Sequence, residues 1–172
     1  MILRLLIVIA FIVTGCSRDN SVETSPITLT KDHACKICGM ISVEYPGPKA
    51  QIQYKKGESE TFCGTPHMFM AYLHPERPRN ISAMYVHDMG EADWDHPKNE
   101  WIDAKTAYYV FGGDKKGPMG EPLVPFSELE EAETYVRDHK GGIIRFNEVT
   151  MDMLSPTKHD KKHSPPQHDH SS

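Results

Sequence analysis

The segment from His33 to Met40 concentrates side chains that could bind a soft metal ion. Its sequence, HACKICGM, holds Cys35 and Cys38 in C-x-x-C spacing and a methionine two positions after the second cysteine. Cysteine pairs of this kind occur in thiol–disulfide enzymes, in zinc sites and in sites for softer metals. The residues around the pair help to distinguish these three kinds of chemistry.

The sequence gives little support for a redox-active thiol pair. Such pairs usually follow a buried strand and begin a helix within a β-α-β pattern. Here a polar segment precedes the pair, and the loop-forming residues 46–48 (Pro-Gly-Pro) follow it. No strand-to-helix junction is evident at Cys35 and Cys38.

A zinc site stays open as an interpretation. Structural zinc takes four nitrogen or sulfur ligands, which often come as two close pairs. Cys35 and Cys38 would form the first pair. Cys63 and His67, at i, i+4 spacing, could form the second if both residues lie on a helix.

Met40 favours copper(I) over zinc. Copper(I) prefers thiolate and thioether sulfur, whereas zinc ligands are typically cysteine, histidine and carboxylate. Gly39 would let the loop curl, so that the sulfur atoms of Cys38 and Met40 converge on one ion. The residues therefore point to a copper(I) site that includes Cys38 and Met40.

The N-terminus resembles a bacterial lipoprotein signal. Arg4 precedes the apolar run of nine residues from Leu5 to Val13, which is too short for a bilayer span of about 20 residues. The following residues, Val13-Thr14-Gly15-Cys16, resemble a lipobox, which implies cleavage after residues 1–15 and lipid attachment at Cys16. The alternative is an ordinary signal peptide that is followed by a cysteine by chance.

Composition limits the partners and the redox state. The chain has 172 residues and a formal net charge of −5, which does not favour binding to nucleic acid. Three of its four cysteines follow Cys16, so at least one of these three thiols has no disulfide partner within the chain.

The chain divides into four regions. Residues 1–15 are the predicted signal peptide, 16–31 a polar tether, 32–154 the folded domain and 155–172 a tail. The tail has too few apolar residues to fold, so we predict that it is disordered. It is rich in histidine, with His159, His163, His168 and His170.

Alternation and helical periodicity predict an α+β fold of two β-β-α-β units in tandem, at about 32–90 and 91–154. The first unit has expected strands at 49–54, 59–63 and 81–89 and a helix at 65–74, with Thr65 as a possible cap. The second has strands at 105–113, within 119–126 and at 143–149 and a helix at 127–140. Ser127 and Glu130 predict a capping box for that helix, and Leu129, Ala132 and Val136 are expected to face inward.

These motifs, in this order, resemble the NosL family of lipoprotein copper chaperones for nitrous oxide reductase. The resemblance runs from about residue 32 to 150 and includes Cys38-Gly39-Met40, the segment GPMGEPLVPF at 117–126, a helix ending in HKGG and the last strand, IIRFNEV. It implies a fold like that of organomercurial lyase and one bound copper(I) ion, with Cys38, Met40 and Met119 as the expected ligands. Residues outside the minimal pattern leave the third ligand open among Cys35, Cys63, His33 and His67, and either Cys35 or Cys63 could instead form a disulfide with Cys38.

The resemblance also implies a place and partners. The expected function is copper(I) delivery for the copper–sulfide centre of nitrous oxide reductase, with that enzyme and its ABC-type maturation transporter as partners. The protein would face the periplasm, anchored through Cys16 and on the outer membrane, and would not be an enzyme. The alternatives are a thiol-based enzyme, either a disulfide oxidoreductase or an organomercurial-lyase-like protein, and an envelope lipoprotein stabilised by zinc or a disulfide.

Overall fold

The structure of the protein, a computed structural model, describes residues 24–90, 92–97 and 100–154. The predicted signal peptide, the lipidation residue Cys16 and the predicted tail lie outside these ranges. Within them, no helix has the length and apolar composition needed to cross a membrane.

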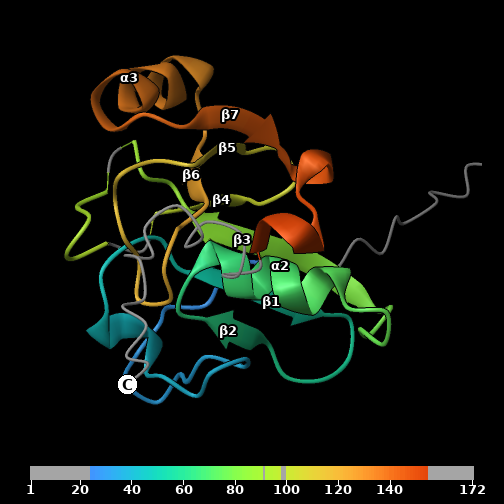
Figure 1. Cartoon of the computed structure of the whole chain (residues 1–172). Helices are drawn as coiled ribbons and strands as arrows, with labels where there is room; N and C mark the ends of the chain where they lie inside the picture. The colour runs from blue at the N-terminus through green and yellow to red at the C-terminus, as the bar shows by residue number, and fades with distance from the viewer. Residues whose placement is uncertain (1–23, 91, 98–99, 155–172) are drawn as a thin grey trace, which may run out of the picture.

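The first half of the described chain forms most of a four-stranded antiparallel sheet with strand order β2-β1-β3-β4. Apolar residues alternate along β1, which places Ile52 in the core. The strand pairs with β2 on one side and with β3 on the other. Helix α2 connects β2 to β3 and lies across one face of this sheet (Figure 1). The bounds are β1 (Ala50–Tyr54), β2 (Glu60–Phe62), α2 (Thr65–Leu73), β3 (Ile81–His87) and β4 (Trp101–Asp103), and a 3-10 helix, η2 (Ser42–Glu44), precedes β1.

The second half forms a three-stranded antiparallel sheet with strand order β6-β5-β7. Helix α3 connects β6 to β7, and α2 and α3 lie on opposite sides of this sheet (Figure 1). The bounds are β5 (Tyr108–Phe111), β6 (Val124–Phe126), α3 (Leu129–His139), β7 (Gly142–Arg145), and two 3-10 helices, η3 (Phe146–Glu148) and η4 (Met151–Leu154).

Successive residues of β5 point into two different cores, as expected for a strand that is covered on both faces. Tyr109 is buried in the larger core, where its ring meets Phe69 of α2 edge-to-face with 5.2 Å between centroids. Val110 belongs to the smaller core, together with Phe126 and Ala132 under α3. The larger core thus joins both sheets around α2. It also fixes the beginning of that helix, where His67 lies.

The fold is a mixed α/β arrangement with antiparallel sheets, and each predicted strand and helix has a counterpart within a few residues. The order β-β-α-β occurs around both α2 and α3. One strand was not predicted: β4 begins at Trp101 and pairs with β3. Because β4 follows residue 90 but extends the first sheet, the division into units of 32–90 and 91–154 stays a prediction.

The predicted capping box of α3 is wrong. The helix has Glu128 as its N-cap and no capping hydrogen bond from a side chain. The backbone N–H of Ser127 donates instead to the carboxylate of Asp88, at 3.2 Å. Leu129 is also 42% exposed, so it does not face inward, whereas Ala132 is buried as expected.

Thr65 does not cap α2 either. It is the first helical residue, after Gly64 as N-cap, and its hydroxyl donates to the carbonyl of Leu123. Pro66 follows it in the first turn of the helix, where proline is tolerated. The bond to Leu123 therefore ties the beginning of α2 to the loop between β5 and β6.

The end of the predicted tether is attached to the first sheet. The side-chain amide of Gln51 both accepts from the N–H of Ile27, at 2.8 Å, and donates to its carbonyl, at 3.2 Å. Gln53 donates to the carbonyl of Ser25 at 2.6 Å. Buried glutamines on β1 thus bind residues 25–27 through their backbone.

Candidate metal centre

The loop that carries Cys35 and Cys38 curls back on itself. The N–H of Cys35 donates to the carbonyl of Met40, and the N–H of Gly39 donates to the carbonyl of Cys35, both at 2.8 Å. Gly39 has a φ of 76°, in the left-handed region that glycine adopts without strain. The curl predicted at Gly39 is therefore present, and it turns Cys38 toward the rest of the molecule.

Hydrogen bonds to Thr61 hold this loop against β2. The N–H of Lys36 donates to the carbonyl of Thr61 at 2.9 Å, and the hydroxyl of Thr61 donates to the carbonyl of Ala34 at 3.0 Å. Cys63 follows β2 two residues after Thr61. The edge of the sheet thus brings the C-x-x-C loop next to Cys63.

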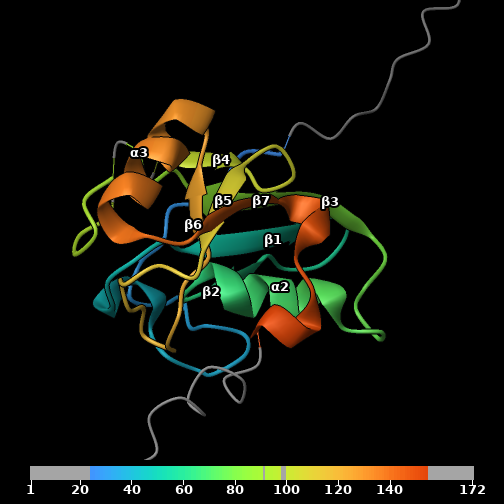
Figure 2. The same ribbon diagram turned by 45° about the horizontal axis from the view of Figure 1, so that its top comes forward.

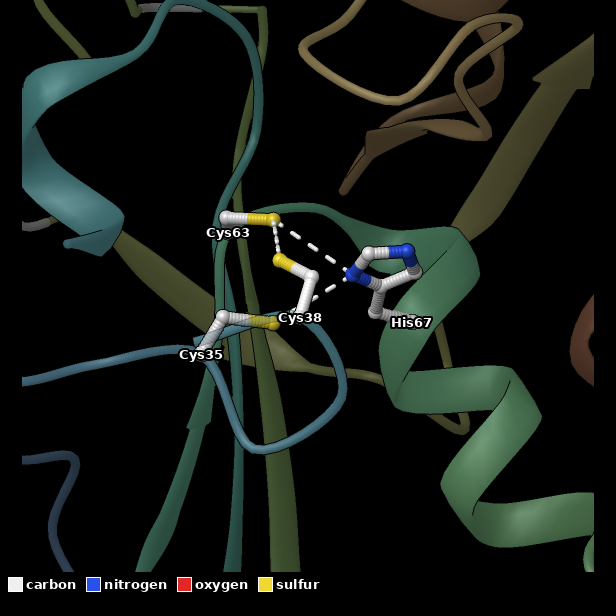
Figure 3. Close-up of side chains that lie close together, drawn as sticks. All are labelled: Cys35, Cys38, Cys63 and His67. Carbon is white, nitrogen blue, oxygen red and sulfur yellow. Dashed lines mark hydrogen bonds between the residues drawn. The ribbon is translucent and has the colours of Figure 1, made fainter. Parts of the chain in front are cut away.

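Helix α2 adds an imidazole to the three thiols. His67 lies in its first turn, and its Nδ1 atom is 3.3 Å from Sγ of Cys35 and 3.4 Å from Sγ of Cys63. The Sγ atoms of Cys38 and Cys63 are 3.6 Å apart. Figure 3 shows the three cysteines and His67 converging from the loop, the end of β2 and the start of α2.

The spacing of these four side chains suits a single metal ion. Their ligand atoms all lie within 4.8 Å of one another. Around an ion bound at about 2.3 Å from sulfur and about 2.0 Å from nitrogen, tetrahedral ligand atoms lie roughly 3.5–3.8 Å apart. Cys35, Cys63 and His67 are buried and Cys38 is half-buried, so the group is most open to solvent at Cys38.

The cluster favours one thiolate over several. A hydrogen bond with the Cys63 thiol holds the pKa of Cys35 well below its usual range; burial opposes this, while His67 and the backbone of Cys63 and Cys38 reinforce it. The same contact with Cys35, together with burial, raises the pKa of Cys63. The Cys35 thiolate is thus stabilised by donors around it, and thiolates are the metal-binding form of cysteine.

All three cysteines are free thiols in this structure. The 3.6 Å between the Sγ atoms of Cys38 and Cys63 is a non-bonded contact, because a disulfide bond is about 2.05 Å long. The disulfide between Cys35 and Cys38 that the sequence left open is therefore not formed here.

The expected methionine ligands lie in two different places. Met119 is 55% exposed on the loop between β5 and β6, which lies beside the beginning of α2 (Figure 2). It lines a small cavity together with Cys63 and His67. Met40 is half-buried in the C-x-x-C loop, where its carbonyl binds Cys35. Their roles as ligands stay predictions.

Of the four residues left open as further ligands, the structure brings Cys35, Cys63 and His67 together with Cys38. His33 is elsewhere: its Nδ1 accepts from the N–H of Thr30 at 3.0 Å. The i, i+4 spacing of Cys63 and His67 was the signal in the sequence, although only His67 lies on the helix.

Comparison with known proteins identifies the family. The NosL family profile matches residues 26–154, which is most of the chain and all of its described core. The chain belongs to the NosL family. Curated members include the copper-binding lipoprotein NosL of Stutzerimonas stutzeri, 38% identical over 87% of this chain and 80% of that protein. The copper-binding lipoprotein NosL of Achromobacter cycloclastes is 34% identical over 83% of this chain and 77% of that protein.

A solved NosL structure has the same fold. The crystal structure of the copper chaperone NosL from Shewanella denitrificans matches with a TM-score of 0.71 and 33% identity, over 74% of this chain and 97% of that chain. The resemblance drawn from the sequence motifs is thus confirmed. The NosL relatives are named for copper binding, which is the kind of chemistry expected at the cysteine–histidine cluster.

Proposed function

We propose that this NosL protein is a copper(I) chaperone, which holds one copper(I) ion at Cys35, Cys38, Cys63 and His67. The observation that carries the proposal is the convergence of three thiols and one imidazole nitrogen within 4.8 Å of one another. The names of its relatives, copper-binding lipoprotein and copper chaperone, support the same metal and a role in binding and transfer rather than catalysis.

Copper(I) fits this donor set because it is a soft ion that prefers sulfur. The cavity lined by Cys63, His67 and Met119 provides a side from which a recipient could approach. We propose that Met119, and Met40 within the C-x-x-C loop, serve as thioether ligands during loading or transfer. A thioether has no proton to lose, so it can bind copper without competing with protons.

We further propose that the protein works as a lipoprotein. Its relatives carry that description, and Cys16 follows a lipobox-like sequence. In this proposal the lipid at Cys16 holds the protein at the outer membrane, facing the periplasm. The recipient of the copper is nitrous oxide reductase, with its ABC-type maturation transporter as the second partner.

A copper titration tests the binding step. The reduced protein, titrated with copper(I) against a competing chelator, is expected to bind one equivalent, and Cys38→Ala and Cys63→Ala are expected to lose most of the affinity. A copper(I) affinity that does not change in either variant would remove the cluster as the site. Transfer is tested separately, by restoring activity to copper-depleted nitrous oxide reductase with the loaded chaperone.

Zinc is the second candidate for this site. Three cysteines and one histidine form one of the usual donor sets of structural zinc, and the four ligand atoms are close enough for it. Competition discriminates the two metals: under reducing conditions, copper(I) should displace bound zinc at one equivalent. Zinc that resists an excess of copper(I) would favour a structural role.

A further inference from the structure

Lys49 is a buried charge beside the metal cluster. It precedes β1, and only 1% of it is exposed to solvent. Lysine is almost never fully buried unless its charge is compensated, because removing an ammonium from water is costly. Its position therefore requires a structural explanation.

Three backbone carbonyls satisfy the ammonium group. Nζ of Lys49 donates to the carbonyl oxygens of Tyr45 at 2.7 Å, Pro46 at 3.1 Å and Gly47 at 2.5 Å. These bonds use all three N–H groups of the side chain. The carbonyls are neutral dipoles, so they satisfy the donors but leave the positive charge in place.

The loop that binds Lys49 is also a wall of the metal site. Pro46, Gly47 and Pro48 line the same cavity as Cys63 and His67. The carbonyls that hold the ammonium belong to this same loop, so the positive charge of Lys49 lies beside the wall of the cluster. Burial lowers the pKa of Lys49 to about 8, and the negative charge that Cys63 carries when it is deprotonated opposes that shift.

We propose that Lys49 is the counter-charge of the metal centre, a positioning residue that stabilises its thiolate-rich, copper-loaded form. The inference rests on the proposed copper(I) function. A copper(I) ion bound by two or more thiolates carries a net negative charge, and the cluster is mostly buried. In that environment a fixed positive charge acts more strongly than it does in water.

Lys36 provides a matched comparison. It stands between the two cysteines of the C-x-x-C loop, but its side chain is 60% exposed and forms a salt bridge with Glu60. Water screens such a charge, so it contributes little to the site. Lys36 is thus nearer than Lys49 to the cysteines in the sequence, but only Lys49 holds its charge away from water.

The test compares copper(I) affinity in four variants of the reduced protein, using a competing chelator. Lys49→Met and Lys49→Gln remove the charge and are expected to lose roughly tenfold in affinity. Lys49→Arg keeps the charge and is expected to restore most of it. Lys36→Met should bind like the wild type. Far-ultraviolet circular dichroism of the metal-free proteins checks that each variant is folded.

The outcomes separate this inference from the proposed function. Wild-type protein that does not bind copper(I) overturns both. Wild-type binding with equal affinity in folded Lys49→Met overturns the role of Lys49 alone. Equal losses of copper(I) affinity in Lys49→Arg and Lys49→Gln would show that Lys49 only maintains the shape of the loop. Failure of both neutral variants to fold would show the same.

Discussion

The Sγ atoms of Cys38 and Cys63 lie 3.6 Å apart, although 25 positions separate the two residues in the chain. Cys38 belongs to the curled C-x-x-C loop, and Cys63 follows β2. Hydrogen bonds between that loop and Thr61 join the two segments. The candidate metal centre is therefore a product of tertiary structure, built across the edge of the first sheet.

This contact predicts which disulfide forms on oxidation. A mild thiol oxidant should link Cys38 to Cys63, with the loss of two protons and two electrons to the oxidant. Cys35 would stay free, because this disulfide uses the thiols of both Cys38 and Cys63. The oxidised protein should then no longer bind copper(I). Peptide mapping by mass spectrometry identifies the bond, and a disulfide that includes Cys35 would contradict this arrangement.

His67 is expected to contribute to copper binding, whereas His33 is not. His67→Ala should lower copper(I) affinity by at least about tenfold, since even indirect partners of metal ligands typically contribute that much. His33→Ala is the control, because that imidazole binds Thr30 outside the cluster. A chelator competition measures both. Equal affinities for the two variants would place the nitrogen ligand elsewhere.

Met119 should have a smaller effect on affinity than the cysteines. It is 55% exposed at the cavity beside the cluster, and loss of one thioether donor is expected to cost about 1 kcal/mol, or about fivefold in affinity. Met151→Ala is the control, since Met151 is 45% exposed on η4. If Met119→Ala binds and transfers copper as the control does, Met119 is not a ligand.

Local sequence patterns predicted most of the fold. Alternation in 49–54 and helical spacing in 65–74 gave elements close to β1 and α2. The misses depend on contacts that no local pattern contains. Strand β4 is three residues long and is defined by its pairing with β3. The capping box at Ser127 failed because the carboxylate of Asp88, 39 positions away, takes the N–H of Ser127.

Only part of the site could be predicted, because its geometry also depends on contacts between distant segments. Cys38 was recognised from its own loop, and Gly39 correctly indicated the curl. The meeting of that loop with Cys63 and His67 requires the parallel bridge between Cys35 and Thr61. A bridge between segments 26 positions apart has no signature in either segment, so Cys63 and His67 could only be named as possibilities.

Burial of His87 predicts a loss of stability in mild acid. Burial, with a smaller effect from the nearby charge of Lys49, lowers the pKa of His87 from 6.5 to about 3. The unfolded chain therefore binds a proton that the folded protein does not, and stability is lost as the pH falls from about 6.5 toward 3.

Urea unfolding of the metal-free protein at pH 7 and pH 5 measures this effect. His87 alone should account for about 2 kcal/mol of the loss between these two values. The His87→Gln variant, which has no imidazole to protonate, should lose correspondingly less. Equal losses in the two proteins would contradict a neutral, buried His87.

X-ray absorption at the copper edge of the loaded, reduced protein tests most directly whether copper(I) binds at this cluster. Ligation by Cys35, Cys38, Cys63 and His67 predicts a copper(I) edge and a ligand shell dominated by sulfur, with one nitrogen. Cys63→Ser should reduce the sulfur contribution. A shell of only nitrogen and oxygen atoms, or one that does not change in Cys63→Ser, would contradict the assignment of the copper to this cluster.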